Sequence, residues 1–288
     1  MVRLSELIAV FYSIALVSQS VQAEDAAKKT FEVETHADMA YRSDKEADPV
    51  KHKLDIYLPK GQKDFPVMMF VHGGSWKSGN KGLYAALGST FAKQGIGTVI
   101  INYRLSDIKY KAKHPEHIQD VASAFAWVHA NIGKYGGRDD RIFVSGHSAG
   151  AHLVALLATD ETYLKAHKLG LDNIRGVMSL SGVYEIVPNF FVYDGPFGKD
   201  EAIRKAASPL FQVKEKHPPF LICYGDRDFP TIDKMSETFC KKLVECKGDA
   251  CILKMEKRDH FSIIIQLAIN AEDPCTKAMT DFIAKRSK

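Results

Sequence analysis

Ser148 lies in the pentapeptide Gly146-His147-Ser148-Ala149-Gly150, a G-x-S-x-G pattern that could make its hydroxyl a nucleophile. The preceding residues, 141–145, are largely apolar and predict a buried strand, whereas 151–158 are rich in helix formers. A sharp turn between such a strand and helix lifts a serine above the sheet edge, and it needs glycine where the two backbones pass close. We therefore interpret Ser148 as a nucleophile for attack on a carbonyl carbon. A base, an acid and oxyanion donors should then lie elsewhere in the chain.

The base should be a histidine, because a serine hydroxyl attacks poorly until a neighbouring group takes its proton. Of the 11 histidines, His260 follows the last predicted strand, in a loop from which its imidazole could reach the serine. His147 adjoins the serine, but neighbouring side chains at a tight turn point apart, so we expect it to pack. No carboxylate–histidine cluster completes a metal site around His114 and His117, which we interpret as surface or helix-cap residues.

The carboxylate that orients this base should follow an earlier strand. The segment Tyr224-Gly225-Asp226-Arg227-Asp228 supplies two aspartates at the end of the apolar run 219–224. We favour Asp228, which stands three residues after a glycine. Asp226 is the competing candidate, and a surface ion pair with Arg227 is its alternative role.

The oxyanion donors should be backbone N–H groups that face the oxygen as it becomes negative. Ala149, directly after the nucleophile, is one expected donor. Gly74 and Ser75 are the others, because they lie in the sequence His72-Gly73-Gly74-Ser75-Trp76 that follows the apolar run 66–71.

The elements that must position these residues are strands alternating with helices. Strands are predicted at 31–36, 52–58, 66–71, 97–103, 141–145, 174–181, 219–224 and 251–255, and helices at 84–94, 117–132, 151–158, 231–246 and 274–286. This alternation predicts the α/β class, with a mostly parallel sheet and helices on both faces. The segment 182–207 is irregular and aromatic. With Trp76, its rings could wall an acyl or aryl pocket or pack in the core.

Composition favours one large globular domain, since the 288 residues are 45% hydrophobic and 26% charged. The net charge of +4 is spread along the chain, and short lysine runs such as 28–29 and 241–242 lack interleaved aromatics. Solvated surface therefore explains them better than nucleic-acid binding. Beyond the leader described next, no apolar stretch is long enough to cross a membrane.

The first 23 residues are predicted to be a signal peptide, with a single catalytic domain at 24–288. Arg3 precedes a short apolar run, 7–17, and Val21 and Ala23 are small residues suited to cleavage after Ala23. A buried N-terminal helix is the alternative interpretation. Export predicts a secreted or periplasmic protein in which disulfides are permitted.

The five cysteines are therefore candidates for disulfides. A Cys246–Cys251 bridge is the most plausible pairing and Cys240–Cys275 a second, with Cys223 a buried thiol in a core strand. The spacing matches no zinc pattern.

With these motifs in order, the chain resembles the hormone-sensitive-lipase-like esterases, and within them the branch holding kynurenine formamidase and secreted carboxylesterases or feruloyl-type esterases. The resemblance runs from Leu54 to His260 and rests on HGG-x-W at 72–76, G-x-S-x-G at 146–150 and D-H-F at 259–261. It implies an α/β-hydrolase fold with a mostly parallel eight-stranded sheet and a small or minimal cap. It also implies acyl hydrolysis without metal or cofactor.

The expected activity is hydrolysis of a small-molecule ester, with small acyl or aryl groups, through an acyl-enzyme on Ser148. Serine at position 75 replaces the third glycine of many lipases, which favours small acyl groups. The acid motif of the family is matched only loosely, by Asp228-Phe229-Pro230. Formamidase activity on an N-formyl aryl amine is the first alternative, and a secreted binding protein without catalysis is the second. The oligomeric state stays open.

Overall fold

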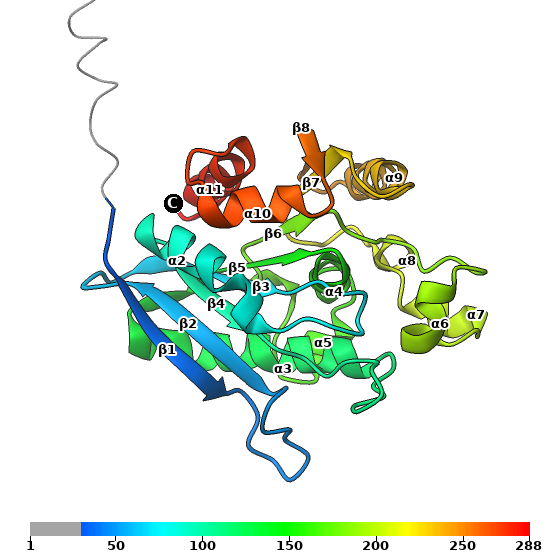
Figure 1. Ribbon diagram of the computed structural model, residues 1–288, viewed down its shortest axis with the longest axis horizontal. Coiled ribbons are helices and arrows are strands. Elements are labelled where there is room, and N and C mark those ends of the chain that lie inside the picture. The colour runs from blue at the N-terminus through cyan, green and yellow to red at the C-terminus, as the bar shows by residue number, and fades with distance from the viewer. Residues whose placement is uncertain (1–29) are drawn as a thin grey trace, which may run out of the picture. The chain divides into compact units, whose positions relative to one another are not determined.

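The apolar runs of the sequence form one eight-stranded sheet in the computed structural model, which describes residues 30–288 (Figure 1). The strands are β1 (Val33–Ala40), β2 (Lys53–Pro59), β3 (Phe65–Val71), β4 (Gly97–Ile101), β5 (Gly137–His147), β6 (Gly176–Leu180), β7 (Phe220–Arg227) and β8 (Ala250–Asp259). Their spatial order is β1-β2-β4-β3-β5-β6-β7-β8.

The sheet is mostly parallel, as the alternation of strands and helices predicts. Only the β1–β2 and β2–β4 pairs are antiparallel, and every pair from β4 to β8 is parallel. Parallel strands end at one edge, so the residues that follow β5, β6, β7 and β8 share that edge. The three predicted triad residues follow β5, β7 and β8.

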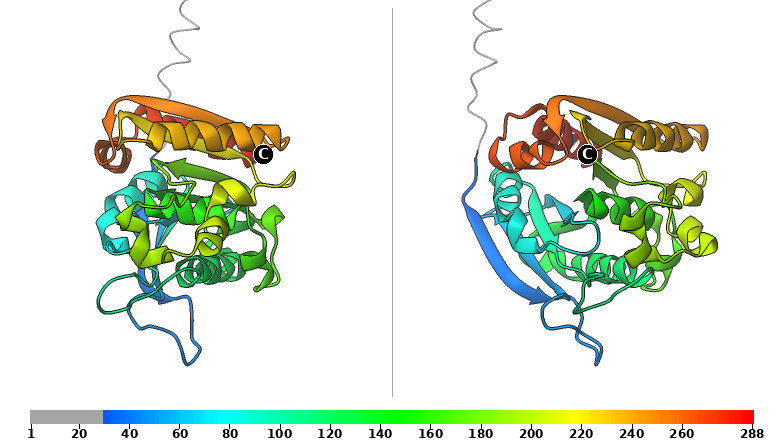
Figure 2. Two further views of the ribbon diagram at one scale, coloured as in Figure 1. Left: turned by 90° about the vertical axis from the view of Figure 1, so that its right-hand side faces the viewer. Right: turned by 45° about the vertical axis from the view of Figure 1, so that its right-hand side comes forward.

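Helices cover both faces of the sheet (Figures 1 and 2). On one face, α3 (Glu116–Asn131), α4 (Ala149–Leu157) and α9 (Ile232–Glu245) bury apolar residues in one core cluster. On the other, α2 (Ala85–Lys93), α10 (Ser262–Ile269) and α11 (Pro274–Arg286) bury theirs in a second. Strands covered on both sides are mostly apolar, and every residue of β4 and β6 is buried.

A small cap stands between β6 and β7, where the sequence predicts an irregular aromatic segment. It contains α6 (Phe191–Phe197), α7 (Glu201–Ala206) and α8 (Pro209–Gln212), which lie close together in Figure 1. Trp76, Tyr184, Tyr193 and Phe197 are core residues with at most 4% of their surface exposed. The remaining short helices are η1 (Lys81–Tyr84), η2 (Ile132–Tyr135), α5 (Thr162–Lys165) and η3 (Leu171–Asn173).

Helix α10 is absent from the sequence prediction, although it directly follows the loop of the predicted base. The carboxylate of Asp259 accepts the N–H groups of Phe261 (3.0 Å) and Ser262 (2.7 Å), which turns the chain from β8 into the helix. Asp259 thus shapes the loop that leads into α10.

The predicted disulfides are wrong, because all five cysteines are free. Cys240 on α9 packs on one face of the sheet and Cys275 on α11 on the other, so the sheet separates them. Cys246 ends α9 and packs against the first core cluster, whereas the Cys251 thiol faces the Phe220 carbonyl at 3.7 Å.

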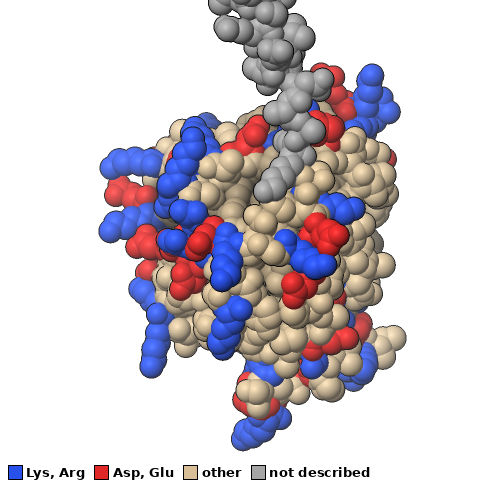
Figure 3. Space-filling view, turned by 90° about the vertical axis from the view of Figure 1, so that its left-hand side faces the viewer, with Lys and Arg blue, Asp and Glu red and all other residues tan. Residues whose placement is uncertain are grey.

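The predicted signal peptide, 1–23, lies outside the described residues. No helix in the part of the chain that is described has the length and apolarity to span a membrane. On the face shown in Figure 3, basic and acidic side chains are interspersed. Close ion pairs occur across the described chain, such as Lys60–Glu32 at 2.7 Å and Arg138–Asp140 at 2.6 Å.

Candidate active site

Ser148 occupies the turn between β5 and α4 with φ 55° and ψ −118°, a conformation rarely adopted by residues other than glycine. Its N–H donates to the carbonyl of Leu180 on β6 (2.9 Å), and its own carbonyl accepts the N–H of His152 (3.0 Å). Strain of this kind persists only where the surroundings impose it, and it clusters at functional sites. The predicted sharp turn is present, and it leaves the serine side chain partly exposed.

The glycines of this turn are required by close backbone contacts. A Cβ on Gly150 would lie 2.0 Å from the Val71 carbonyl oxygen, and one on Gly146 would lie 2.5 Å from Gly150. A Cβ on Gly73 would lie 3.1 Å from that of Ser148, so the loop after β3 passes directly beside the serine.

His260 and Asp228 meet, as the sequence predicts. His260 Nδ1 lies 2.7 Å from Asp228 Oδ1, and the two side chains are 6% and 2% exposed. Asp228 also accepts the Ser181 hydroxyl (2.5 Å) and the N–H of Phe229 (2.8 Å). Burial acts to raise the pKa of Asp228, but the hydrogen bonds from His260 and Ser181 outweigh it and hold the pKa below its usual value.

This contact defines the tautomer of the imidazole. An ionised carboxylate only accepts, so Nδ1 of His260 carries the proton and Nε2 keeps a lone pair for a base. The ring of Phe229 stacks on the imidazole with 4.2 Å between the ring centroids. The ring of Phe261 meets the imidazole edge-on, with 5.5 Å between the centroids. The other candidate acid, Asp226, is exposed and accepts the N–H of Arg258 (3.1 Å).

His147 connects the nucleophile's strand to the base. Its Nε2 lies 2.8 Å from the backbone carbonyl of His260, and the two imidazole rings are 4.7 Å apart. It is buried, as the sequence predicts. Among the described residues, the hydroxyl of Ser148 has no hydrogen-bond partner, and His147 beside it contacts the backbone of His260.

The predicted oxyanion donors have free N–H groups. Within residues 30–288, the N–H groups of Gly74, Ser75 and Ala149 have no hydrogen-bond partner. Ala149 begins α4, where the first N–H groups lack partners within the helix and favour negative charge. Gly74 has φ 121° and Ser75 has φ 53°, both in the left-handed region.

Buried aromatic residues hold this loop in shape. The His72 ring stacks on Tyr103 at 4.5 Å, and the Tyr84 hydroxyl accepts the N–H of Gly73 at 3.2 Å. Trp76 Nε1 donates to Nδ1 of His152 on α4 at 3.2 Å, which joins the loop to the helix after the nucleophile. The HGG-x-W motif is therefore a rigid, anchored loop rather than only a tight turn.

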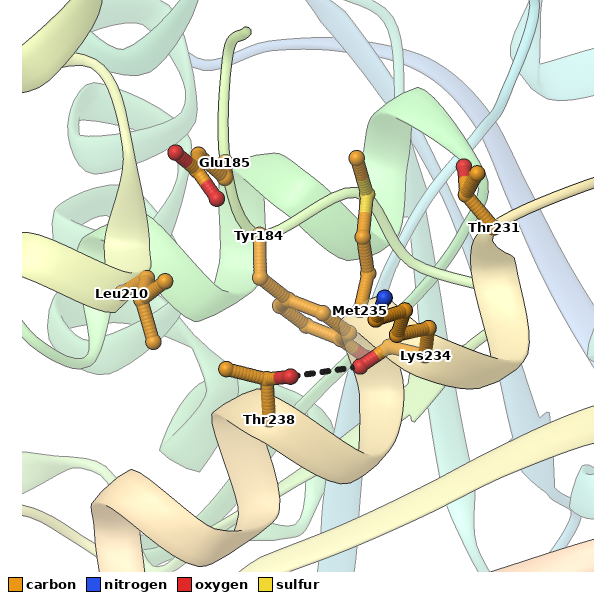
Figure 4. Close-up of a pocket in the computed structure, with 7 residues that line it drawn as sticks. All are labelled: Tyr184, Glu185, Leu210, Thr231, Lys234, Met235 and Thr238. Atoms are coloured by element: carbon orange, nitrogen blue, oxygen red, sulfur yellow. Dashed lines mark hydrogen bonds between the residues drawn. The ribbon is translucent and has the colours of Figure 1, made fainter.

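Two pockets lie on the side of the acid. One, of about 190 Å³, has Leu210 and Glu185 on one side and residues of α9 on the other (Figure 4). Its full lining is Tyr184, Glu185, Leu210, Thr231, Lys234, Met235 and Thr238. The second, of about 180 Å³, includes Asp228 and Phe229 and shares Thr231 with the first. Ser148 lines neither pocket; the second neighbours Asp228, whereas the first is linked to it only through the shared Thr231.

The interpretation of His114 and His117 as surface or helix-cap residues is wrong for His117, and His114 is half-buried. His117 is buried, with Nε2 at 2.9 Å from the Ser106 hydroxyl, and His114 contacts the ring of Phe197 at 6.0 Å. Among the described residues there is no group of three His, Cys, Asp or Glu side chains that could hold a metal ion.

Sequence reasoning did not identify Ser181 and Phe229 as neighbours of the acid and base. A signal was present in each case. Ser181 directly follows β6 at the same sheet edge, and Phe229 directly follows Asp228. Tyr84, whose hydroxyl supports the Gly73 N–H, had no such signal because its contact depends on how η1 folds back.

Sequence comparison finds a family match and similarity to esterases and formamidases. A family model described as BD-FAE matches residues 54–243. Esterase LipC of Mycobacterium tuberculosis is 32% identical over 211 residues, which cover 66% of this chain and 51% of LipC. Kynurenine formamidase of Danio rerio is 28% identical over 241 residues, covering 81% of this chain and 78% of the relative. The chain spans about half the length of the curated esterases it matches first.

Solved structures show the same fold. A truncated carbohydrate esterase from gut microbiota has a TM-score of 0.76 at 24% identity, covering 91% of this chain and 98% of the other. Esterase B from Lactobacillus Rhamnosis has a TM-score of 0.74 at 20% identity, covering 98% and 95%. At these identities the likeness establishes architecture, and the chemistry must be argued from the site.

Proposed function

The chain belongs to the BD-FAE family, and we propose that it is a serine hydrolase that cleaves esters of small acyl or aryl groups. The observation that carries this proposal is a serine at a strained strand–helix turn, joined through His147 to a histidine that an ionised aspartate orients. Esterases among its relatives support the proposal.

The proposed reaction begins with attack of Ser148 Oγ on the ester carbonyl. His260 Nε2 takes the hydroxyl proton, because Nδ1 already donates to Asp228 and fixes the tautomer. The ionised carboxylate then stabilises the imidazolium that forms beside it. Negative charge develops on the carbonyl oxygen at the same time.

The N–H groups of Gly74, Ser75 and Ala149 would receive that charge. They need no rearrangement, since none has a partner within the described chain and the loop is anchored by buried rings. His260 then returns the proton to the leaving alcohol, whose departure leaves an acyl group on Ser148. Water activated by the same imidazole releases the acid and restores the serine.

An ester panel with the Ser148→Ala variant tests this function. We expect wild-type turnover of p-nitrophenyl acetate and a loss of about 10⁶-fold in kcat when the nucleophile is removed. The variant should keep the wild-type melting temperature, because the side chain makes no hydrogen bond in the described structure. Turnover that survives this substitution would overturn the assignment.

Formamide hydrolysis is the second candidate, favoured by kynurenine formamidases that match most of this chain. The same triad could attack an N-formyl group, with His260 protonating an amine. The kcat/KM ratio for p-nitrophenyl acetate and N-formylkynurenine separates the two. We expect the ester to be preferred, and a strong preference for the formamide would reverse the order of the candidates.

Export belongs to the same proposal. Arg3, the apolar run 7–17 and Ala23 are typical of a cleaved signal peptide. Expression of the full chain in an exporting host, followed by N-terminal sequencing of secreted or periplasmic protein, should find Glu24 as the first residue. Retention in the cytoplasm with an intact N-terminus would contradict it.

A further inference from the structure

His147 is a buried polar residue that the proposed reaction does not use. Only 4% of its surface is exposed, and it is the last residue of β5, directly before Ser148. Its Nε2 faces the backbone carbonyl of His260 at 2.8 Å. A carbonyl only accepts, so this nitrogen must carry a proton.

The other ring nitrogen of His147 has no partner. Nδ1 is buried without a hydrogen bond in the described structure, and a Cβ on Gly73 would stand 3.1 Å from it. Burial, with a smaller contribution from His260, lowers the pKa of His147 to about 3. The ring is therefore neutral, protonated at Nε2, and its conformation is specified by the one bond it makes.

That bond connects residues from two strands that are not neighbours in the sheet. The nucleophile follows β5 and the base follows β8, and two strands, β6 and β7, stand between them. The imidazole of His260 is held by Asp228 and Phe229, both from the loop after β7. Among the hydrogen bonds of the described residues, the one from His147 is what ties the main chain of residue 260 to the strand of the serine.

We propose that His147 is a positioning residue, which sets the distance between the nucleophile and the base by holding the backbone of His260. This role rests on the proposed function, because it matters only if Ser148 and His260 exchange a proton. A neutral imidazole at His147 is compatible with this positioning role. The rings of 147 and 260 are 4.7 Å apart, and a charge on His147 would oppose the imidazolium that forms on His260 during attack.

The test compares His147→Phe with His147→Gln. Phenylalanine keeps a ring of similar size but cannot donate to the carbonyl, whereas a glutamine amide can reach it. We expect kcat of His147→Phe to fall by about 10²-fold with KM close to wild type, since about 1 Å of misplacement has that effect. His147→Gln should recover most of the loss. Asp228–His260 contact persists in both, so the pH at which kcat/KM is half-maximal should not move.

His117→Phe is the matched control, because His117 is also buried, has one bonded nitrogen and has an unpartnered Nδ1. Any decrease in the kcat of this variant should be no larger than the decrease in its fraction of folded protein. If His147→Phe does not fold, His147→Asn against His147→Gln replaces it, since the shorter amide does not reach the position of Nε2. Wild-type kcat in His147→Phe, or in His147→Asn, would overturn the positioning role.

The same variants distinguish a failure of the positioning role from a failure of the proposed function. Ester turnover that persists in Ser148→Ala would overturn the proposed function and the positioning role together. Turnover lost in Ser148→Ala but kept in His147→Phe would overturn the positioning role alone.

Discussion

Asp226 and Asp228 stand two residues apart at the end of one strand, yet their surroundings differ. Asp228 is enclosed by donors, with its side chain 2% exposed and His260 at 2.7 Å, whereas Asp226 faces solvent. β7 ends at Arg227, so Asp226 keeps a strand position whereas Asp228 lies in the loop beyond it, where its carboxylate reaches His260. In the sequence, the position three residues after a glycine favoured the aspartate that contacts His260 in the structure.

Replacing Asp228 with asparagine should therefore lower kcat by about 10⁴-fold with little change in fold. The amide would donate to His260 Nδ1, which stabilises the tautomer whose Nε2 is protonated and cannot act as a base. Steady-state kinetics on p-nitrophenyl acetate would measure the loss. Asp226→Asn is the control and should keep wild-type kcat, and equal losses in both variants would contradict the role of Asp228.

The packing of His147 could be predicted from the sequence, but its hydrogen bond to His260 could not. The sequence correctly predicts that it packs, because a side chain next to the nucleophile points away from it. Its bond to the carbonyl of His260 could not be predicted, since that contact joins residues 113 positions apart and depends on the loop between β8 and α10. The same holds for Phe229, whose ring covers the imidazole.

At the scale of elements, the central strands were predictable because they are apolar runs, and the long helices because their apolar residues recur at the helical period. β3, β4 and β6 are buried almost throughout, and largely apolar runs mark them in the sequence. The cap and α10 were not, because α6 contains Pro196 and α10 is nearly uniformly apolar. The disulfide error has the same origin, since sequence separation does not show which face of the sheet a cysteine occupies.

The crossing of β5, α4 and the loop after β3 leads to a stability prediction. Gly150→Ala would place a methyl group 2.0 Å from the carbonyl oxygen of Val71, a backbone atom that cannot move aside. We expect a loss of at least about 3 kcal/mol in the free energy of unfolding, the upper end of ordinary overpacking. Urea denaturation would measure it.

Gly133→Ala provides the control for that substitution. A Cβ at Gly133 would meet nothing within 4 Å, and its backbone lies outside the left-handed region. We expect its stability to match or slightly exceed the wild type. Similar stabilities for Gly150→Ala and Gly133→Ala would show that the crossing is looser than the contacts indicate.

For the molecule as a whole, buried neutral histidines couple folding to pH. Burial lowers the pKa of five of them to about 3 or 4, namely His72, His114, His117, His147 and His152. In the unfolded chain each would titrate near its ordinary pKa of about 6.5. Between these values the unfolded state binds more protons, so stability is greatest above about pH 6.5 and falls as the pH drops toward the folded-state values.

We therefore expect acid unfolding near pH 5. Five such groups together remove about 9 kcal/mol between pH 7 and pH 5 by this linkage, which is comparable to the whole stability of a typical domain. Circular dichroism during an acid titration would follow the transition. His117→Phe lacks one of the five histidines that bind a proton on unfolding, so the midpoint of its acid transition should lie at lower pH. A wild-type fold that persists to pH 3 would contradict the expectation.

In the proposed mechanism, the hydroxyl of Ser148 is the atom that takes the acyl group. Reaction with a fluorophosphonate, followed by peptide mass spectrometry, tests it most directly, because this reagent forms a stable adduct with an activated serine. We expect one adduct per chain on the peptide that contains Ser148, slower labelling in Asp228→Asn and none in Ser148→Ala. No adduct on the wild-type chain, or an adduct on another serine that Ser148→Ala retains, would contradict it.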